Sequence, residues 1–279
     1  MLLGLSRRWR DYRSLRKEQD MAEKLKELAR RYPRFGYRRL HQMLLREAPA
    51  GRVNVKRVRR LCVLAGLKLP TRRRRKRGGK GIKPPVVAEY RNHVWAYDFV
   101  FDWCENGRQL KFLTVEDEFT RESLAIEVDY RMGASRVCSV LLWLMEQRGV
   151  PGYVRSDNGP EFVAKALSRM LAVKGVACRH IDPGSPWQNG RNERFNGIFR
   201  DECLNMETFH HRDHARAVSR LFWRYYNQER PHSSLGWRTP VEFSRRHPMG
   251  AAGCVVSDLN IPEPAAPMGC RNVNDSLPL

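Results

Sequence analysis

Three acidic residues lie in sequence settings that suit phosphoryl transfer on nucleic acid. Asp98 interrupts an aromatic stretch predicted to form a strand, Asp157 directly follows a short predicted strand, and Glu193 lies where a turn becomes a helix. Mg²⁺ prefers carboxylate oxygens, and two divalent cations about 3.5–4 Å apart can stabilise both the attacking and the leaving oxygen of a phosphodiester. The sequence therefore predicts that these three acids form a catalytic metal site.

Each acid also has a purely structural interpretation. Asp98 could pair with a basic group in the core, Asp157 could simply start a turn, and Glu193 could complement the dipole of its helix. The metal site is favoured because the segment between Asp157 and Glu193 has room for one helix, one strand and a loop. Such a segment can bring Glu193 back to the sheet edge where Asp157 lies.

Positive charge is concentrated in the N-terminal third of the chain. The net charge of the 279 residues is +22, and residues 1–90 hold 28 Lys and Arg against 7 Asp and Glu. A concentration of this kind is typical of proteins that bind a polyanion, and it predicts DNA as the partner. A generally basic surface, the competing interpretation, would spread the charge along the whole chain.

Helical periodicity predicts a small DNA-reading unit within residues 21–66. Three helices are expected, the first ending before Pro33, the second at 37–46 and the third capped by Asn54. Three helices of which one is basic resemble a helix-turn-helix DNA reader, whereas a solvated face on an ordinary helix is the alternative. The residues of the third helix expected to contact DNA are Lys56, Arg57, Arg59 and Arg60.

A run of basic residues and glycines follows at residues 72–81. Like charges repel one another and glycine loosens the chain, so this run predicts a mobile arm that lies along DNA phosphates. The residues of the arm expected to contact DNA are Arg72, Arg73, Arg74 and Arg75.

From His93 onward the pattern alternates between strands and helices. Three strands in a meander are expected at 94–103, 109–115 and 123–128. Further helices and strands alternate at 135–148, 153–155, 161–174, 177–181 and 189–203, and a last helix is expected at 214–227. This order predicts an α/β fold of the ribonuclease H type, a mixed five-stranded sheet with flanking helices.

Several longer motifs occur in order between about residues 20 and 246. They are RFGYRRL at 34–40, DEFTR at 117–121, SDNGPEF at 156–162, GSPWQNG at 184–190, FNG at 195–197, RDECLN at 200–205 and YNQERPH at 226–232. With these motifs the chain resembles the second-reading-frame transposases of bacterial insertion sequences, which belong to the retroviral-integrase-like DDE superfamily.

The resemblance implies an integrase catalytic core and roles for particular residues. The family's three acids fall on Asp98, Asp157 and Glu193, which would bind two Mg²⁺ ions, replaceable by Mn²⁺, and its basic residue falls on Arg200. The implied reaction cleaves one strand at an element end, and the exposed 3′-hydroxyl then attacks target DNA without a covalent enzyme intermediate. The pair Arg191-Asn192 departs from the aromatic or aliphatic pair expected there.

The resemblance also implies partners. These are element-end and target DNA, further copies of the protein on that DNA, and the product of an upstream reading frame as a fusion or a separate partner. The sequence has no recognisable signal peptide and no apolar stretch long enough to span a membrane. We therefore expect a bacterial cytoplasmic protein associated with the nucleoid.

Four regions are expected along the chain. They are a helix-turn-helix-like domain at 1–70, a basic linker at 71–92, an integrase core at 93–246 and a disordered tail at 247–279. The residues alone leave two other functions open: a non-catalytic DNA-binding regulator, and a ribonuclease H-fold nuclease that cuts without joining. The presence of all three acids favours the transposase over the regulator.

Overall fold

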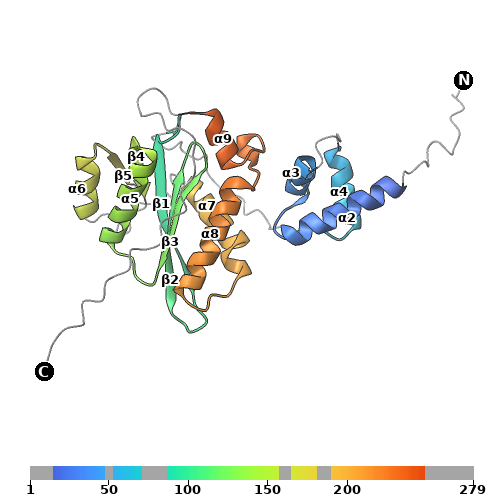
Figure 1. The fold of residues 1–279 in the computed structure, drawn as a ribbon, viewed down its shortest axis with the longest axis horizontal. Coiled ribbons are helices and arrows are strands. Elements are labelled where there is room, and N and C mark those ends of the chain that lie inside the picture. Colours follow the sequence, from blue (N-terminus) through green and yellow to red (C-terminus); the bar gives the residue numbers. More distant parts are fainter. Residues whose placement is uncertain (1–14, 48–52, 71–86, 157–164, 181–189, 249–279) are drawn as a thin grey trace, which may run out of the picture.

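The computed structural model describes residues 15–47, 53–70, 87–156, 165–180 and 190–248. Within these residues the chain forms a small helical unit and a larger α/β core (Figure 1). The expected basic arm and most of the expected disordered tail lie outside the described residues, as does the first part of the helix expected at 161–174. Among the described residues, no helix is both long and apolar enough to span a lipid bilayer.

The helical unit consists of α2 (Leu15–Arg31), α3 (Tyr37–Glu47) and α4 (Val55–Leu64). Its core draws apolar side chains from all three helices, among them Leu25, Leu28, Leu40, Leu44, Val58 and Leu61. The side chain of Asn54 accepts a hydrogen bond from the backbone N–H of Lys56 at 2.8 Å, which caps α4. The three helices expected from periodicity, and the cap on the third, are confirmed.

A five-stranded mixed sheet forms the centre of the α/β core. Its strands are β1 (Val94–Trp103), β2 (Gln109–Asp117), β3 (Ser123–Asp129), β4 (Tyr153–Ser156) and β5 (Ala177–His180). The spatial order is β3-β2-β1-β4-β5, with antiparallel pairing in the β1–β2–β3 meander and parallel pairing of β4 with both β1 and β5. β1 pairs with β2 along nearly its whole length, but with β4 only from Val94 to Ala96.

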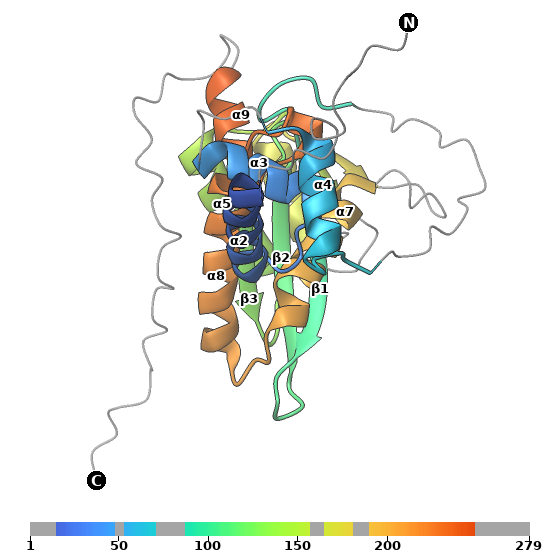
Figure 2. The ribbon, with the colours of Figure 1, turned by 90° about the vertical axis from the view of Figure 1, so that its right-hand side faces the viewer.

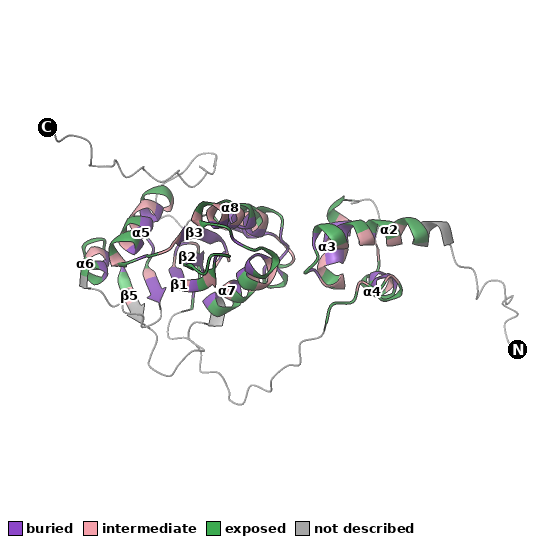
Figure 3. Ribbon diagram, turned by 90° about the horizontal axis from the view of Figure 1, so that it is seen from below, coloured by how far each residue is buried: buried purple, intermediate pink, exposed green. Residues whose placement is uncertain are grey.

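Helices cover both faces of the sheet and bury a separate apolar core on each (Figures 1 and 3). α5 (Ala134–Arg148) and α6 (Lys165–Val173) lie on one face, and α7 (Gly190–Glu202) and α8 (Arg212–Gln228) lie on the other. Side chains alternate between the faces of a strand, so Tyr97 of β1 packs toward α5 whereas Val100 packs toward α7. The expected ribonuclease H type of fold is confirmed.

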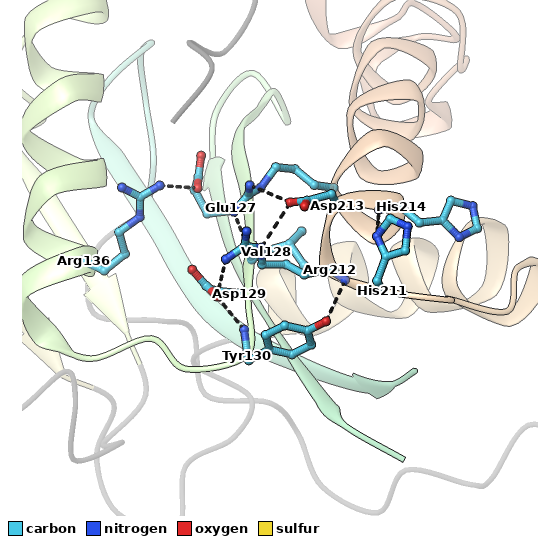
Figure 4. Close-up of polar contacts among 10 residues, drawn as sticks. Glu127, Val128, Asp129, Tyr130, Arg136, His211, Arg212, Asp213 and His214 are labelled. Atoms are coloured by element: carbon cyan, nitrogen blue, oxygen red, sulfur yellow. Dashed lines mark hydrogen bonds and ion pairs between the residues drawn. The ribbon is translucent and has the colours of Figure 1, made fainter. Parts of the chain in front are cut away.

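Polar contacts fix α8 against the edge strand β3. The backbone N–H of Arg212 donates to the hydroxyl of Tyr130 at 3.1 Å, while its guanidinium lies between Asp129 at 3.5 Å and Asp213 at 3.2 Å (Figure 4). Farther along α8, the indole N–H of Trp223 donates to the main-chain oxygen of Ser123 at 2.6 Å. These contacts hold α8 in place as the support on which α7 rests.

One helix of the core was not expected from periodicity. α9 (Pro240–Arg246) spans only two turns, too short for an apolar stripe to stand out. Its start nevertheless carries a local signal, because Thr239 and Glu242 form a reciprocal capping box and Pro240 occupies the first turn.

Candidate active site

Asp98 lies on β1, on the face of the sheet that α7 covers. Its side chain is half-buried, and Oδ1 accepts a hydrogen bond from the backbone N–H of Phe99 at 2.7 Å. The other oxygen, Oδ2, accepts from the side-chain amide of Asn196 on α7 at 2.9 Å. Two donors therefore orient the Asp98 carboxylate.

A buried threonine fixes the orientation of Asn196. Thr114 lies directly opposite Asp98 in the β1–β2 pairing and is fully buried. Its hydroxyl is 2.9 Å from Oδ1 of Asn196 and 3.2 Å from the main-chain oxygen of Asp98, so its single hydrogen serves one acceptor at a time. With the amide oxygen of Asn196 facing this hydroxyl, the amide nitrogen is left to donate to Asp98.

The rotation of α7 determines which of its residues face Asp98. Phe195 and Phe199 are buried in the apolar core between α7, α8 and the sheet. The opposite side of the helix lines an open cleft of about 320 Å³, to which Asp98 contributes from β1. The residues lining the cleft are Asp98, Phe99, Val100, Phe101, Glu193, Asn196, Gly197 and Arg200. The structure thus brings together two of the three expected catalytic acids.

Arg200 lies two turns beyond Glu193 on the same side of α7. Its guanidinium is exposed and donates to the main-chain oxygen of Phe101 on β1 at 3.1 Å. The carboxylate of Glu202, two residues farther along the chain, is bound by Arg230 at 2.7 Å. The positive charge of Arg200 therefore lies at the edge of the cleft that holds Asp98 and Glu193.

Asp157, the remaining expected acid, lies outside the described residues. The residue before it, Ser156, is buried and ends β4. In the parallel pairing of β4 with β1, Arg155 is the partner of Ala96, which precedes Asp98 by two positions. β4 therefore ends beside the part of β1 that carries Asp98.

Two nearby acids serve the fold. Asp117 is buried and accepts backbone N–H bonds from Asn92, Phe119 and Thr120 at 2.7 to 3.0 Å. Burial raises the pKa of Asp117, and these three bonds act against the rise. Asp102 accepts the backbone N–H of Trp103 at 2.9 Å and is absent from the cleft lining. Neither acid lines the cleft.

The basic residues expected on α4 differ in exposure. The side chains of Lys56, Arg59 and Arg60 are exposed, whereas Arg57 is half-buried. The guanidinium of Arg59 lies 5.9 Å from the ring centroid of Tyr37 on α3. The four arginines expected to contact DNA in the basic arm, Arg72 to Arg75, lie outside the described residues.

Asn196 is a site residue that the sequence interpretation missed. It follows Glu193 by three positions, which is close to one helical turn, and this spacing was the available signal. Under the prediction that Asp98 binds the metal ion, we expect Asn196→Ala to lower metal-dependent DNA cleavage by about 10- to 100-fold and to raise the half-saturating Mg²⁺ concentration, because partners that orient a metal-binding carboxylate typically contribute that much. A Mg²⁺ titration of cleavage measures both effects.

The exposed Asn205, just beyond α7, provides the matched control for this prediction. Asn205→Ala should leave the Mg²⁺ dependence of cleavage unchanged. An unchanged titration for Asn196→Ala would mean that its bond to Asp98 has no part in holding the metal.

Comparison with known families covers most of the described chain. Residues 88–186 match the family described as "Integrase core domain", and residues 174–240 match a second family with the same description. Residues 15–75 match the family described as "HTH-like domain". The three matches follow one another along the chain with a small overlap.

Relatives from bacterial insertion elements share much of the sequence. An uncharacterized 31.7 kDa protein of insertion element IS407 from Burkholderia multivorans is 43% identical over 250 residues, which cover 88% of this chain and 89% of the relative. A 39.2 kDa protein of insertion element IS476 from Xanthomonas euvesicatoria is 43% identical over 82% of this chain and 66% of its own length. Transposase InsD of insertion element IS2 from Escherichia coli is 28% identical over 77% of this chain and 74% of its own length.

Solved structures with similar folds come from retroviruses. A chain of the simian T-cell lymphotropic virus intasome matches 78% of this chain and 80% of its own length, with 17% identity and a TM-score of 0.49. The catalytic core domain of BIV integrase matches 56% of this chain and 95% of its own length, with 23% identity and a TM-score of 0.44.

Proposed function

Because the chain belongs to the insertion-element transposases that carry an integrase core domain, we propose that Asp98, Asp157 and Glu193 catalyse metal-dependent DNA strand cleavage and strand transfer at element ends. The observation that carries this proposal is the open cleft in which α7 presents Glu193 beside Asp98 of β1. Asp157 directly follows the end of β4, the strand next to β1, and is the third acid of the proposed site.

The chemistry of the cleft suits Mg²⁺. One carboxylate is held by two donors and a second is exposed beside it, and Mg²⁺ is usually bound by one or two carboxylates while it keeps several waters. Two such ions, for which Mn²⁺ can be exchanged, supply Lewis-acid stabilisation of the attacking and leaving oxygens. The integrase catalytic core domain of HTLV-2 was solved in complex with magnesium.

Other residues around the cleft position the Asp98 carboxylate and leave room for DNA. Asn196 and Thr114 hold the Asp98 carboxylate in one orientation. Gly197 has no side chain and faces open space, so a DNA strand can approach the backbone of α7 closely at that point. In the proposed sequence of steps, water first cleaves one strand at the element end. The 3′-hydroxyl so exposed then attacks a phosphodiester of the target, so that the element end is joined to the 5′-phosphate of the target strand and the target's 3′-oxygen leaves as a free hydroxyl.

A strand-transfer assay with labelled element-end DNA and a supercoiled target tests the function. Joined products support the transposase. Cleavage without joining would indicate a nuclease on the same fold, and binding without cleavage would indicate a regulator. The assay is run with the chain alone and with the chain fused to the product of the upstream reading frame, the partner that we propose for it.

We propose that the protein works as an oligomer on DNA within the bacterial cytoplasm, at the nucleoid. DNA binding is assigned to Lys56, Arg57, Arg59 and Arg60 of α4 and to the arm at 72–77. The exposed side chains of α4 support this assignment, and the charge of the N-terminal third supports it for the whole region.

Arg200 is proposed to grip a phosphate next to the one that is cut. We expect Arg200→Ala to lower end cleavage and joining strongly while the free energy of unfolding changes by less than about 0.5 kcal/mol, since the side chain is exposed. Arg200→Lys should recover part of the activity, because the charge remains while the bidentate fork is lost. Cleavage, joining and thermal unfolding are measured on each variant.

Arg194 offers the matched control, since it is exposed on the same helix and does not line the cleft. Arg194→Ala should cleave and join more actively than Arg200→Ala. Wild-type joining by Arg200→Ala would show that this side of α7 does not face DNA.

The arm at 72–77 is proposed to lie along DNA phosphates. Replacement of its Arg and Lys residues by Ala should weaken binding and flatten the plot of log affinity against log salt, by about 0.9 units of slope for each phosphate that the arm no longer neutralises. Arg136→Ala, which removes a charge paired with Glu127 at 2.9 Å, should leave the slope unchanged. Equal slopes for the arm variant and the wild type would mean that the arm does not contact phosphate.

A further inference from the structure

Three of the sequence motifs meet at a contact between the helical unit and the α/β core. Arg39 comes from the motif at 34–40, Glu202 from the motif at 200–205 and Arg230 from the motif at 226–232. None of these side chains lines the catalytic cleft. The helical unit lies on the side of the core formed by α7 and α8, with its helices in front of them in Figure 2.

Glu202 is the centre of this contact. Its side chain is 6% exposed and accepts two hydrogen bonds from the guanidinium of Arg230, each of 2.7 Å, and one from the hydroxyl of Tyr225 at 3.0 Å. Burial acts to lower the pKa of Arg230, but its bonds with Glu202 outweigh that effect and the net shift is upward. Burial raises the pKa of Tyr225, and the charge of Glu202 raises it further. The three groups form a charged, hydrogen-bonded cluster within the core.

Arg39 of α3 joins this cluster from the helical unit. Its guanidinium lies 3.4 Å from Glu202 and 5.3 Å from the ring centroid of Phe35, and the side chain is 31% exposed. Beside it, the ring of Tyr225 lies 5.9 Å from that of Tyr32, against which it is stacked, and 6.2 Å from that of Phe35. Charge and aromatic packing thus act together at one point of contact.

Further polar contacts lie at the margins of the interface. The hydroxyl of Tyr32 donates to Glu229 at 3.0 Å, and the guanidinium of Arg46 donates to Glu242 of α9 at 2.7 Å. Contacts on both sides of Arg39 restrict rotation of the helical unit about that residue.

The position of Glu202 links this interface to the catalytic cleft. Glu202 is the last residue of α7, the helix that carries Glu193, Asn196 and Arg200. At about 1.5 Å of rise per residue, Glu193 and Glu202 are held about 13.5 Å apart along a rigid rod. The helical unit is therefore attached to one end of the element whose other end carries a proposed catalytic acid.

We propose that the Arg39–Glu202 contact determines which phosphodiester is cut, by fixing the distance between the DNA-reading helix α4 and the cleft. This inference rests on the proposed function. Successive phosphates of one strand are spaced by about 3.4 Å along the duplex axis, so a shift of the helical unit by that amount moves the cut by one nucleotide. The covalent connection between the units includes the basic and glycine-rich run at 72–81, which the sequence predicts to be mobile, and we assign the spacing between the units to the noncovalent contacts.

Arg39→Ala tests the proposal, with the cut sites of end-labelled element DNA mapped at single-nucleotide resolution. In the wild type we expect most cleavage at one phosphodiester. In the variant we expect cuts to spread over the neighbouring phosphodiesters, while affinity for the element end stays within about twofold, because the basic face of α4 is unchanged. Arg39→Lys should restore part of the wild-type preference for a single cut site, since an ammonium still pairs with Glu202.

Arg38→Ala is the matched control, because Arg38 precedes Arg39 on α3 and its side chain bonds to Tyr37 within the same unit, at 3.2 Å. Its cuts should remain at the wild-type phosphodiester. Arg46→Ala removes the exposed ion pair with Glu242 at the margin of the interface. Because an exposed ion pair contributes little to stability, this variant should spread the cut sites less than Arg39→Ala does. If Arg39→Ala fails to fold or to cut DNA, the cut-site distributions of Arg39→Lys and Arg46→Ala test the proposal in its place.

A single wild-type cut site in every interface variant that cuts, whatever its rate, would overturn the proposal and leave the contact with a purely structural role. Failure of the proposed function is a separate outcome, in which the wild-type protein itself cuts no element end. The two failures are therefore distinguished by the wild-type lane of the same experiment.

Discussion

Asp98→Asn, Asp157→Asn and Glu193→Gln are each expected to abolish metal-dependent cleavage and joining while DNA affinity stays unchanged. The amides keep the shape of the side chains but remove the negative charge that holds divalent cations. Loss of several kcal/mol of transition-state stabilisation corresponds to about a thousandfold or more in rate, since about 1.36 kcal/mol is a factor of ten. Cleavage of labelled element ends and an electrophoretic binding assay measure the two quantities.

Asp102→Asn is the matched control for these substitutions, because Asp102 lies on the same strand as Asp98 and outside the cleft lining. Asp117→Asn should lower stability, since it disturbs a buried carboxylate with three backbone donors, but the folded fraction should remain active. Full activity of any of the three cleft variants would remove that residue from the proposed site.

Arg230→Met is expected to cost about 3–5 kcal/mol of unfolding free energy, the largest stability effect that we predict. The side chains of Arg230 and Glu202 are 2% and 6% exposed, and removal of one partner leaves the other charge buried without its bidentate bond. Unfolding by urea, followed by tryptophan fluorescence, provides the measurement.

An exposed ion pair supplies the comparison. Arg136 and Glu127 are paired at 2.9 Å with side chains 43% and 25% exposed, so Arg136→Ala should cost less than about 1 kcal/mol. Arg230→Met combined with Glu202→Gln should recover part of the stability, because the stranded negative charge is gone. Equal losses of unfolding free energy for Arg230→Met and Arg136→Ala would contradict the burial of the Arg230–Glu202 pair.

Much of the fold was predictable from local pattern alone. The bounds of β1 agree with the prediction at both ends, and α3, α5 and α8 agree within two residues. Long amphipathic helices and strands that end at turns carry their periodicity in neighbouring residues, so no knowledge of distant partners is needed to predict them. The short helix α9 was not predicted, because its two turns are too few for a repeating apolar pattern to be recognised.

The candidate site was predictable only in part. Asp98 and Glu193 stood out because acids among aromatic residues or at the start of a helix are conspicuous in a sequence. Thr114 did not, because a threonine within a strand looks ordinary until the fold brings its partner Asn196 to it. Side-chain networks that join distant segments depend on tertiary packing, which local periodicity does not encode.

The bond between Asn196 and Asp98 joins residues that are 98 positions apart. Contacts of such long range form late in folding, because closing a long loop costs chain entropy before the contacts can stabilise the structure. The contacts among α2, α3 and α4 are local in the sequence. On a ribosome that is still translating, the helical unit therefore has the chance to fold before any cleft exists. We expect an interrupted chain that ends before α7 to occupy DNA without nicking it, so that abortive synthesis spares the host chromosome from breaks.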